Sequence, residues 1–221
     1  LRRKYHVDDV LVVRHGTLFL SMPEGEFFFH PRMAHVRVKN LRQGKPDHFV
    51  EAAGLRAGMS VLDCTLGLGA DAIVASYVVG DTGHVRTLEI RPLIAAIVSF
   101  GLAQPEETGP MAEAMRRIEV IPADYREFLR RQPNKSVDVV YFDPMFRKPV
   151  WNSVGLRPLR ALADGRPLDE AALLEACRVA RQRVVLKETH DSEEFSRLGF
   201  SSYEGGKYSR VRYGIIEVSS Q

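Results

Sequence analysis

The stretch SVLDCTLGLGADA, residues 60–72, decides the fold class of this chain. A short apolar run ends at Asp63, a loop with Gly67 and Gly69 follows, and a helical pattern begins at Asp71. Strand, glycine loop and helix in this order open the nucleotide-binding sheets of α/β proteins. The stretch therefore predicts a βα unit whose loop lies at the carboxyl end of a parallel strand.

The chain beyond this stretch repeats the alternation of short strands and helices. The first five predicted strands span residues 60–64, 84–90, 117–124, 137–143 and 182–188. The predicted helices include Asp71–Val79, Pro92–Ala103, Tyr125–Arg131 and Asp169–Arg181. Such alternation predicts parallel strands with helices on both faces. Two final strands, joined at Gly205-Gly206-Lys207, close the chain as an antiparallel hairpin. We therefore expect an α/β, doubly wound, mostly parallel seven-stranded sheet with a C-terminal antiparallel hairpin.

The first 46 residues follow another pattern, which we interpret as a small β-hairpin extension in contact with the substrate. Residues 10–21 and 26–30 are β-like runs, and Met-Pro-Glu-Gly between them is a turn sequence. A helix near Pro46–Ala53 follows, with Asp47 as its N-cap. We accordingly divide the chain into an extension over residues 1–46 and a main domain over residues 47–221.

Size and composition are those of a globular protein with one main domain. The chain has 221 residues, of which 45% are hydrophobic and 27% charged, and its formal net charge is +3. No unbroken apolar run approaches the roughly 18 residues that a membrane-spanning helix needs, so we expect no membrane partner. Cys64 and Cys177 lie far apart without a metal-ligand spacing, which predicts reduced thiols, a cytoplasmic location and no metal site. Oligomeric state has no signal in the sequence.

Basic residues are concentrated in three segments, which would suit a nucleic-acid partner if they converged on one cleft. The segments contain Arg32, Arg37, Lys39, Arg42 and Lys45, then Arg147 and Lys148, and finally Lys207, Arg210 and Arg212. We interpret His30-Pro31-Arg32 and Arg37 as a clamp on an RNA backbone, and the alternative is a solvated charged face.

The glycine loop alone fits two cofactors. Gly67-x-Gly69-x-x-Ala72 satisfies the dinucleotide fingerprint, and Glu89 lies 20 residues after Gly69, where an acidic residue would bind a ribose. This pattern suits both a nicotinamide cofactor and S-adenosylmethionine (SAM).

Acidic residues at the ends of consecutive strands favour SAM. Asp63 ends the first strand, where a carboxylate would meet a cation such as the SAM ammonium and would be poorly placed near a pyrophosphate. Asp124 ends the third strand and offers an acceptor for an adenine amine. A turn or a cap is the plainer explanation for each residue alone, but four acidic strand ends in order favour a cationic ligand with a ribose and an adenine. The cofactor-binding candidates are Asp63, Thr65, Gly67, Gly69, Asp71, Glu89, Ile90, Asp124, Tyr125 and Asp143.

The fourth strand ends in Asp143-Pro144-Met145-Phe146, which suits methyl transfer to an exocyclic amine of a nucleobase. Such an amine is a poor nucleophile because its lone pair is delocalised into the ring. The Asp143 carboxylate and the Pro144 carbonyl, fixed by the rigid φ of proline, would accept its two hydrogens and aim the lone pair at the sulfonium methyl. Phe146 would stack on the base. These three residues are the catalytic candidates, and the alternative is that Asp-Pro merely terminates the strand.

Several stretches resemble the RsmJ-type SAM-dependent methyltransferases, which methylate the N2 amine of a guanine in small-subunit ribosomal RNA. They are VLDCTLGLGADA (61–72), LEIRPLIAAIVSFGLA (88–103), VVYFDPMF (139–146) and LLEACRVARQRVVLKE (173–188), and the resemblance runs from Asp47 to Val218. It implies a class I methyltransferase (Rossmann-like) fold, SAM as methyl donor, and a guanine-containing RNA as acceptor. By position, it also implies one set of contacts. Asp63, Gly67 and Gly69 would hold the amino-acid end of SAM, Glu89 its ribose, Asp124 its adenine side, and Asp143 the target amine.

Some segments depart from that family. A second proline and often a tyrosine are usual where Met145 and Phe146 stand, and residues 147–165 replace a lysine-rich loop. The fifth strand ends in Lys187-Glu188-Thr189 rather than in a more basic run. Lys187 would contact an RNA phosphate or be a plain surface lysine, and Trp151 would stack on a nucleotide or anchor its loop.

Other functions remain as alternatives. The nearest is the same chemistry on an adenine N6 amine or on a small molecule. A nicotinamide-dependent oxidoreductase would need a catalytic Tyr/Lys pair or a histidine beside the nicotinamide, and no convincing set is evident. A binding module that kept the fold and lost the reaction is the third alternative. The sequence does not distinguish free RNA from an assembled ribosomal subunit as the acceptor.

Overall fold

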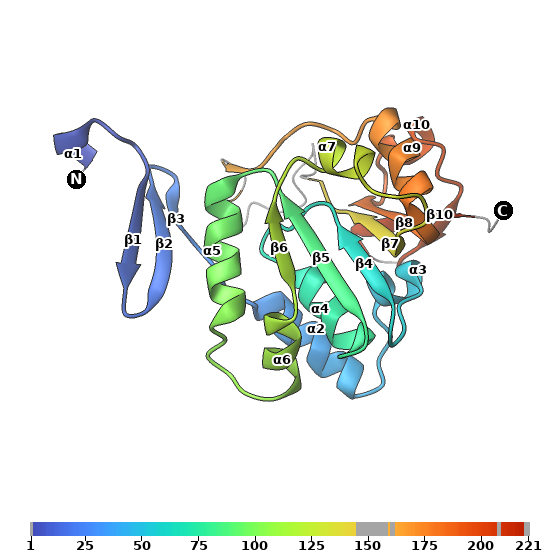
Figure 1. Cartoon of the computed structure of the whole chain (residues 1–221), viewed down its shortest axis with the longest axis horizontal. Coiled ribbons are helices and arrows are strands. Elements are labelled where there is room, and N and C mark those ends of the chain that lie inside the picture. The colour runs from blue at the N-terminus through green and yellow to red at the C-terminus, as the bar shows by residue number, and fades with distance from the viewer. Residues whose placement is uncertain (1, 145–158, 160–161, 207–208, 219–221) are drawn as a thin grey trace.

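The computed structural model describes residues 2–144, 159, 162–206 and 209–218. Within these residues, seven strands form one sheet in the order β6-β5-β4-β7-β8-β10-β9, and Figure 1 shows helices on both of its faces. Strands β6, β5, β4, β7 and β8 are parallel, whereas β10 is antiparallel to both β8 and β9. The doubly wound α/β fold with a C-terminal antiparallel hairpin is therefore confirmed.

Most of the element bounds lie close to those that the sequence predicts. The strands of the sheet are β4 (Ser60–Asp63), β5 (His84–Glu89), β6 (Glu119–Pro122), β7 (Val137–Phe142), β8 (Ala180–Thr189), β9 (Ser202–Glu204) and β10 (Val211–Glu217). Within the described part of the chain, the helices that follow residue 47 are α3 (His48–Ala53), α4 (Ala70–Val79), α5 (Pro92–Ala103), α6 (Pro110–Arg116), α7 (Tyr125–Arg130), α9 (Glu170–Val179) and α10 (Glu194–Arg197). Helix α9 ends before its predicted bound because Ala180 already pairs with Val137 as part of β8. Among the described residues, no helix combines the length and apolar character that crossing a membrane requires.

The N-terminal segment is a three-stranded antiparallel sheet rather than the expected hairpin of two strands. After a short helix α1 (Arg2–Tyr5), strands β1 (Val10–Arg14), β2 (Thr17–Met22) and β3 (Gly25–Phe28) pair in sequence order. The run over residues 10–21 divides because His15 and Gly16 both have positive φ, 50° and 76°, which makes a tight turn between β1 and β2. Strand β2 packs against α5, and Figure 1 shows this small sheet at one end of the molecule.

Helix α2 (Arg32–Arg42) joins the small sheet to the main domain and packs against α4. Just before it, the Phe29 ring lies so close to Gly101 of α5 that a Cβ at that glycine would overlap the ring. The predicted cap of α3 is confirmed, because Asp47 accepts hydrogen bonds from the N–H groups of Phe49 and Val50 at 3.1 and 3.3 Å. Phe29 and α2 thus make close contacts across the boundary that the sequence suggests between residues 46 and 47.

Alternate residues of the buried strands face two separate apolar cores. Val139 and Tyr141 of β7 belong to the core that α2, α3, α4, α5 and α6 cover. Their neighbours Val140 and Phe142 belong to the core that α7, α9 and α10 cover. This alternation is the period of two that a β-strand imposes on its side chains. It also determines toward which face of the sheet each side chain at a strand end points.

Candidate active site

Acidic residues meet at one edge of the sheet, at the carboxyl ends of its central parallel strands. Asp63 is the last residue of β4, Glu89 is the last residue of β5, and Asp143 directly follows β7. Because β4 pairs in parallel with both β5 and β7, these three residues come from adjacent strand ends. Asp124 follows β6, the next strand outward. The sheet therefore brings the four predicted acidic strand ends to one edge.

Two glycines shape the loop between β4 and α4. Gly67 and Gly69 have φ values of +52° and +73°, which L side chains rarely adopt, and Gly69 is the N-cap of α4. The N–H of Gly69 donates to the carbonyl of Leu66 at 2.7 Å and closes a tight turn. A loop of this form lets the backbone approach a ligand closely at the start of a helix.

Asp63 is a buried acidic residue without a basic partner among the described residues. Its side chain accepts hydrogen bonds from the N–H of Thr65 at 2.9 Å and from the Thr65 hydroxyl at 3.4 Å. Among the described residues, no lysine, arginine or histidine forms an ion pair with it, and the residue is only 2% exposed. Burial raises the pKa of Asp63 to about 8, against the opposing effect of the Thr65 hydrogen bonds, and the nearby charges of Asp71 and Asp143 add to the rise. A cationic ligand such as the SAM ammonium fits this position.

Thr65 connects the two halves of the edge. Its hydroxyl donates toward Asp63 and accepts the backbone N–H of Asp143 at 2.6 Å. One side chain from the glycine loop therefore determines where the backbone of β7 turns at Asp143.

Asp71 lies at the centre of a buried charge network that the sequence does not predict. The guanidinium of Arg37, from α2, donates to one oxygen of Asp71 at 2.5 Å and holds Asp47 through two further bonds of 2.7 and 2.8 Å. The other Asp71 oxygen accepts from the Tyr141 hydroxyl at 3.0 Å and from the Lys187 ammonium at 3.1 Å. Burial alone would raise the pKa of Asp71, but Lys187 and Arg37 hold it well below its usual range. Because protein donors take both oxygens, the expected contact of Asp71 with the cofactor does not follow from this geometry.

Lys187 joins this network to Asp143. Its ammonium lies 2.7 Å from the Asp143 carboxylate, and the two side chains are 18% and 26% exposed. Phe142 of β7 pairs with Leu186 of β8. The residues that follow them, Asp143 and Lys187, therefore lie side by side at the edge of the sheet. Lys187 is therefore neither an exposed surface lysine nor, in this arrangement, an unpaired cation for an RNA phosphate. Burial raises the pKa of Asp143 to about 6, although Lys187 opposes the rise, and the charge of Asp71 adds to it.

The second strand end carries Glu89 and Ile90. Glu89 is buried, and one of its carboxylate oxygens accepts the N–H of Arg91 at 2.9 Å. Burial raises its pKa, against hydrogen bonds from the backbone of Arg91 and Gly67. Ile90 is half-buried beside it. Glu89 thus lies next to the glycine loop, as a ribose-binding residue would.

Asp124 and Tyr125 lie at the start of α7. Asp124 is the N-cap of this helix and accepts the N–H of Arg126 at 2.9 Å, while its other oxygen accepts from Arg166 at 3.1 Å. The ring of Tyr125 packs edge-on against Phe142 with 5.4 Å between centroids. In this structure Asp124 serves as a cap and an arginine partner, so its contact with an adenine remains a prediction.

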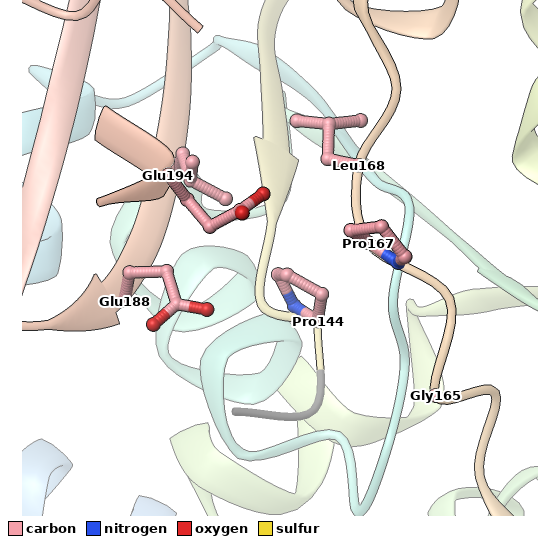
Figure 2. A pocket seen from close by; sticks show the side chains of 7 residues that line it. Pro144, Gly165, Pro167, Leu168, Glu188 and Glu194 are labelled. Atoms are coloured by element: carbon pink, nitrogen blue, oxygen red, sulfur yellow. The ribbon is translucent and has the colours of Figure 1, made fainter. Parts of the chain in front are cut away.

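A pocket lies beside Pro144, on the face of the sheet opposite to the buried charge network. Figure 2 shows Glu188 and Glu194 on one side of Pro144 and Pro167 and Leu168 on the other. Leu186 also lines it. Both glutamates are buried, and burial raises the pKa of Glu188, against a hydrogen bond from the N–H of Thr189 and with an added effect of Glu194. Sequence reasoning missed this pair, and the signal was the acidic residue that follows Lys187 at the end of β8.

The structure gives one residue of the expected RNA clamp a different role. The prediction was wrong for Arg37, which is 17% exposed and pairs with Asp47 and Asp71 in the charge network described above. His30 is half-buried, and burial together with the nearby charge of Arg32 lowers its pKa, whereas Arg32 itself is exposed. The catalytic candidate Phe146 and the candidates Arg147, Lys148, Trp151 and Lys207 lie outside the described residues.

The chain is similar in sequence to a known family and to several known proteins. A family model with the description "Putative SAM-dependent methyltransferase" matches residues 26–212. The chain is 45% identical over 214 residues to the uncharacterized protein YpiP of Bacillus subtilis, and the match covers 96% of this chain and 82% of that protein. It is 34% identical over 181 residues to the ribosomal RNA small subunit methyltransferase J of Cronobacter sakazakii, which covers 78% of this chain and 66% of that protein.

A solved structure supports the fold. A SAM-dependent methyltransferase from Neisseria gonorrhoeae superposes with a TM-score of 0.69, over 96% of this chain and 84% of that chain, at 20% sequence identity. At this level of identity the likeness concerns the fold alone.

Proposed function

The chain belongs to the RsmJ-like family of class I SAM-dependent methyltransferases, and from this premise we propose that it methylates the exocyclic N2 amine of a guanine in small-subunit ribosomal RNA. The observation that carries the proposal is Asp143, a carboxylate at the end of β7 that Lys187 and Thr65 hold beside the buried Asp63. The name of the Cronobacter sakazakii relative, ribosomal RNA small subunit methyltransferase J, supports ribosomal RNA as the acceptor. We expect the enzyme to work in the cytoplasm, where that RNA is made and assembled.

SAM, as the cofactor of this family, supplies a methyl group on a positively charged sulfonium. Asp63 would hold its ammonium, because a buried carboxylate without a protein cation gains most from a cationic partner. The backbone at Gly67 and Gly69 would lie against its amino-acid end, and Glu89 would accept hydrogen bonds from its ribose hydroxyls. Family membership decides between the two cofactors that the glycine loop fits, and the nicotinamide alternative loses its basis.

Asp143 and Pro144 would orient the acceptor amine. The Asp143 carboxylate accepts one N–H of the amine and the Pro144 carbonyl accepts the other, so that the nitrogen lone pair is directed at the methyl group. Lys187 and Thr65 fix the Asp143 side chain and backbone, which removes the need to order them in the transition state. No strong base is required, since the amine loses its proton easily once it carries the extra methyl. Phe146 would stack on the base, as proposed from the sequence.

Asp63 gives a prediction on SAM binding. With a pKa of about 8, most Asp63 carboxyls carry a proton at pH 7, and a bound ammonium will displace it. We expect SAM binding at pH 7 to release about one proton, measured as a difference between the calorimetric enthalpies in phosphate and in Tris. At pH 9.5 the release will disappear, and Asp63→Asn will weaken binding and abolish the release. An enthalpy that does not depend on the buffer at pH 7 would show that Asp63 is already ionised.

Nucleoside analysis tests the acceptor. Small-subunit ribosomal RNA from a strain that lacks the gene will lose one N2-methylguanosine, detected by mass spectrometry of the digested RNA. A plasmid with the wild-type gene will restore it, and one with Asp143→Ala will not. Methylation of an adenine N6 amine instead would replace the guanine proposal with the nearest alternative. Assays on free RNA and on purified small subunits would then identify the form of the acceptor.

A further inference from the structure

Glu188 is a buried carboxyl group beside the proposed methyl-transfer site, and the proposed chemistry does not use it. It belongs to β8, where Leu186 and Glu188 face the core of α9 and α10 and Lys187 faces the opposite side toward Asp143. Glu188 therefore lines the pocket next to Pro144, one residue away from the side chain that holds Asp143. Figure 2 shows its carboxylate directed toward Pro144.

The two glutamates of this pocket differ in how their charge is balanced. Glu194 forms an ion pair with Arg197 at 2.5 Å. Glu188 is 5% exposed, and none of the lysines, arginines and histidines that the structure describes forms an ion pair with it. One of its oxygens accepts the N–H of Thr189 at 2.8 Å and the Thr189 hydroxyl at 3.5 Å, which orients the carboxylate. The Ser192 side chain also hydrogen-bonds to the carboxylate. A carboxylate has about four acceptor positions, so beside its bonds with Thr189 and Ser192 Glu188 keeps room for one donor from a ligand in the pocket.

The chemistry of this pocket separates the nucleobases. In guanine, the N2 amine lies beside N1–H, which is a donor. In adenine and in cytosine, the ring nitrogen beside the exocyclic amine is an acceptor. A carboxylate attracts the guanine edge and repels the lone pair that the other two bases present. Leu168, Pro167 and Leu186 give the pocket an apolar lining beside the two glutamates.

We propose that Glu188 is a specificity-determining residue, which accepts a hydrogen bond from N1–H of the target guanine while Asp143 and Pro144 hold the N2 amine. The inference rests on the proposed function and adds how the site selects guanine. In this arrangement Asp143 and Pro144 accept from the amine and Glu188 accepts from N1–H. Asp143 and Glu188 then lie on the two sides of Pro144, at the end of β7.

The test uses an RNA stem–loop that contains the methylated position found by nucleoside analysis, with either guanine or 2-aminopurine at that position. 2-Aminopurine keeps the N2 amine but has an acceptor at N1. Wild-type enzyme will bind and methylate the guanine RNA at least about 10-fold better than the 2-aminopurine RNA. Glu188→Gln will lose about 10- to 100-fold on the guanine RNA and gain on the 2-aminopurine RNA, because its side-chain amide can donate to N1.

Glu193→Gln is the matched control, since Glu193 is exposed next to Glu194 and has no part in the pocket. It should keep the wild-type preference and the wild-type rate. The gain on 2-aminopurine cannot arise from partial unfolding, so it separates recognition from a loss of structure. If Glu188→Gln keeps the wild-type preference, the inference fails and the proposed function stands. If the wild-type enzyme methylates no guanine in any RNA tested, the proposed function fails as well.

Discussion

Replacing Asp143 by alanine will reduce methyl transfer by about 100- to 1,000-fold and leave the affinity for SAM within a few-fold of the wild-type value. The change removes an acceptor that contacts the reacting amine, whereas Asp63 and the glycine loop remain to hold the cofactor. Lys187 keeps its pairing with Asp71 in the variant, so the fold should survive. Single-turnover transfer of labelled methyl and calorimetry with SAM measure the two effects separately.

Asparagine at the same position distinguishes an acceptor from a base. Asp143→Asn retains one acceptor oxygen, so we expect its rate to exceed that of the alanine variant by about 10-fold or more. If Asp143 instead had to take up a proton, both variants would be equally inactive. In the wild-type enzyme the rate should rise with pH through about 6 as Asp143 ionises, and this limb should be absent from the asparagine variant.

A matched aspartate provides the control for both variants. Asp81 is exposed in the turn after α4, at the end of the sheet away from the site. Asp81→Ala should retain wild-type activity. Full activity of Asp143→Ala would contradict the mechanism proposed here, and a large loss of SAM affinity would assign Asp143 to cofactor binding.

Replacing Arg37 by methionine will destabilise the protein by about 3–5 kcal/mol. Arg37 holds the carboxylates of Asp47 and Asp71 through three hydrogen bonds, and its side chain is 17% exposed. Methionine fills much of the same volume but leaves both carboxylates without this partner in a poorly hydrated site. The free energy of unfolding from urea titrations at pH 7 measures the loss, and Arg42→Met, on the exposed face of α2, should change it by no more than about 0.5 kcal/mol.

The pH dependence of this loss has a definite sign. The pKa values of Asp47 and Asp71 are lowered in the folded protein, because the attraction of Arg37, and for Asp71 also of Lys187, outweighs the effect of burial. Their contribution to stability is complete above the unfolded pKa of about 3.9 and declines as the pH falls through the lowered values. The difference between wild type and Arg37→Met should therefore shrink below about pH 4. A difference that stays constant down to pH 2 would show that the methionine acts through packing alone.

Local signals were sufficient for the elements whose ends are marked by a change of residue type. Helix α5 has the predicted bounds because Pro92 suits its first turn and the apolar pattern stops at Ala103. Strand β7 has its predicted start because the β-branched run begins at Val137. The division between β1 and β2 was missed because a positive φ at His15 depends on the pairing of both flanking strands, and a histidine alone does not indicate it.

The residues of the candidate site also fall into those that local signals predict and those that depend on distant contacts. Asp63, Glu89 and Asp143 could be predicted because parallel strands bring their ends to one edge, whatever the details of packing. The partners of Asp71 could not, since Arg37 and Lys187 come from elements far away in the sequence and meet only in the folded chain. A basic residue looks the same in the sequence whether it binds RNA or neutralises a buried carboxylate.

The contact of Phe29 with Gly101 has a consequence for how the chain can be divided. Together with Arg37 it means that a chain shortened to begin at residue 47 would uncover the part of α5 that Phe29 and β2 contact, and would leave Asp71 without one of its two cations. We therefore expect the segment before residue 47 and the catalytic domain to unfold in a single transition. The segment that the sequence presents as an appendage is then an integral part of the catalytic domain. Substitutions in it will affect catalysis, because the segment supports the charge network that positions Asp143.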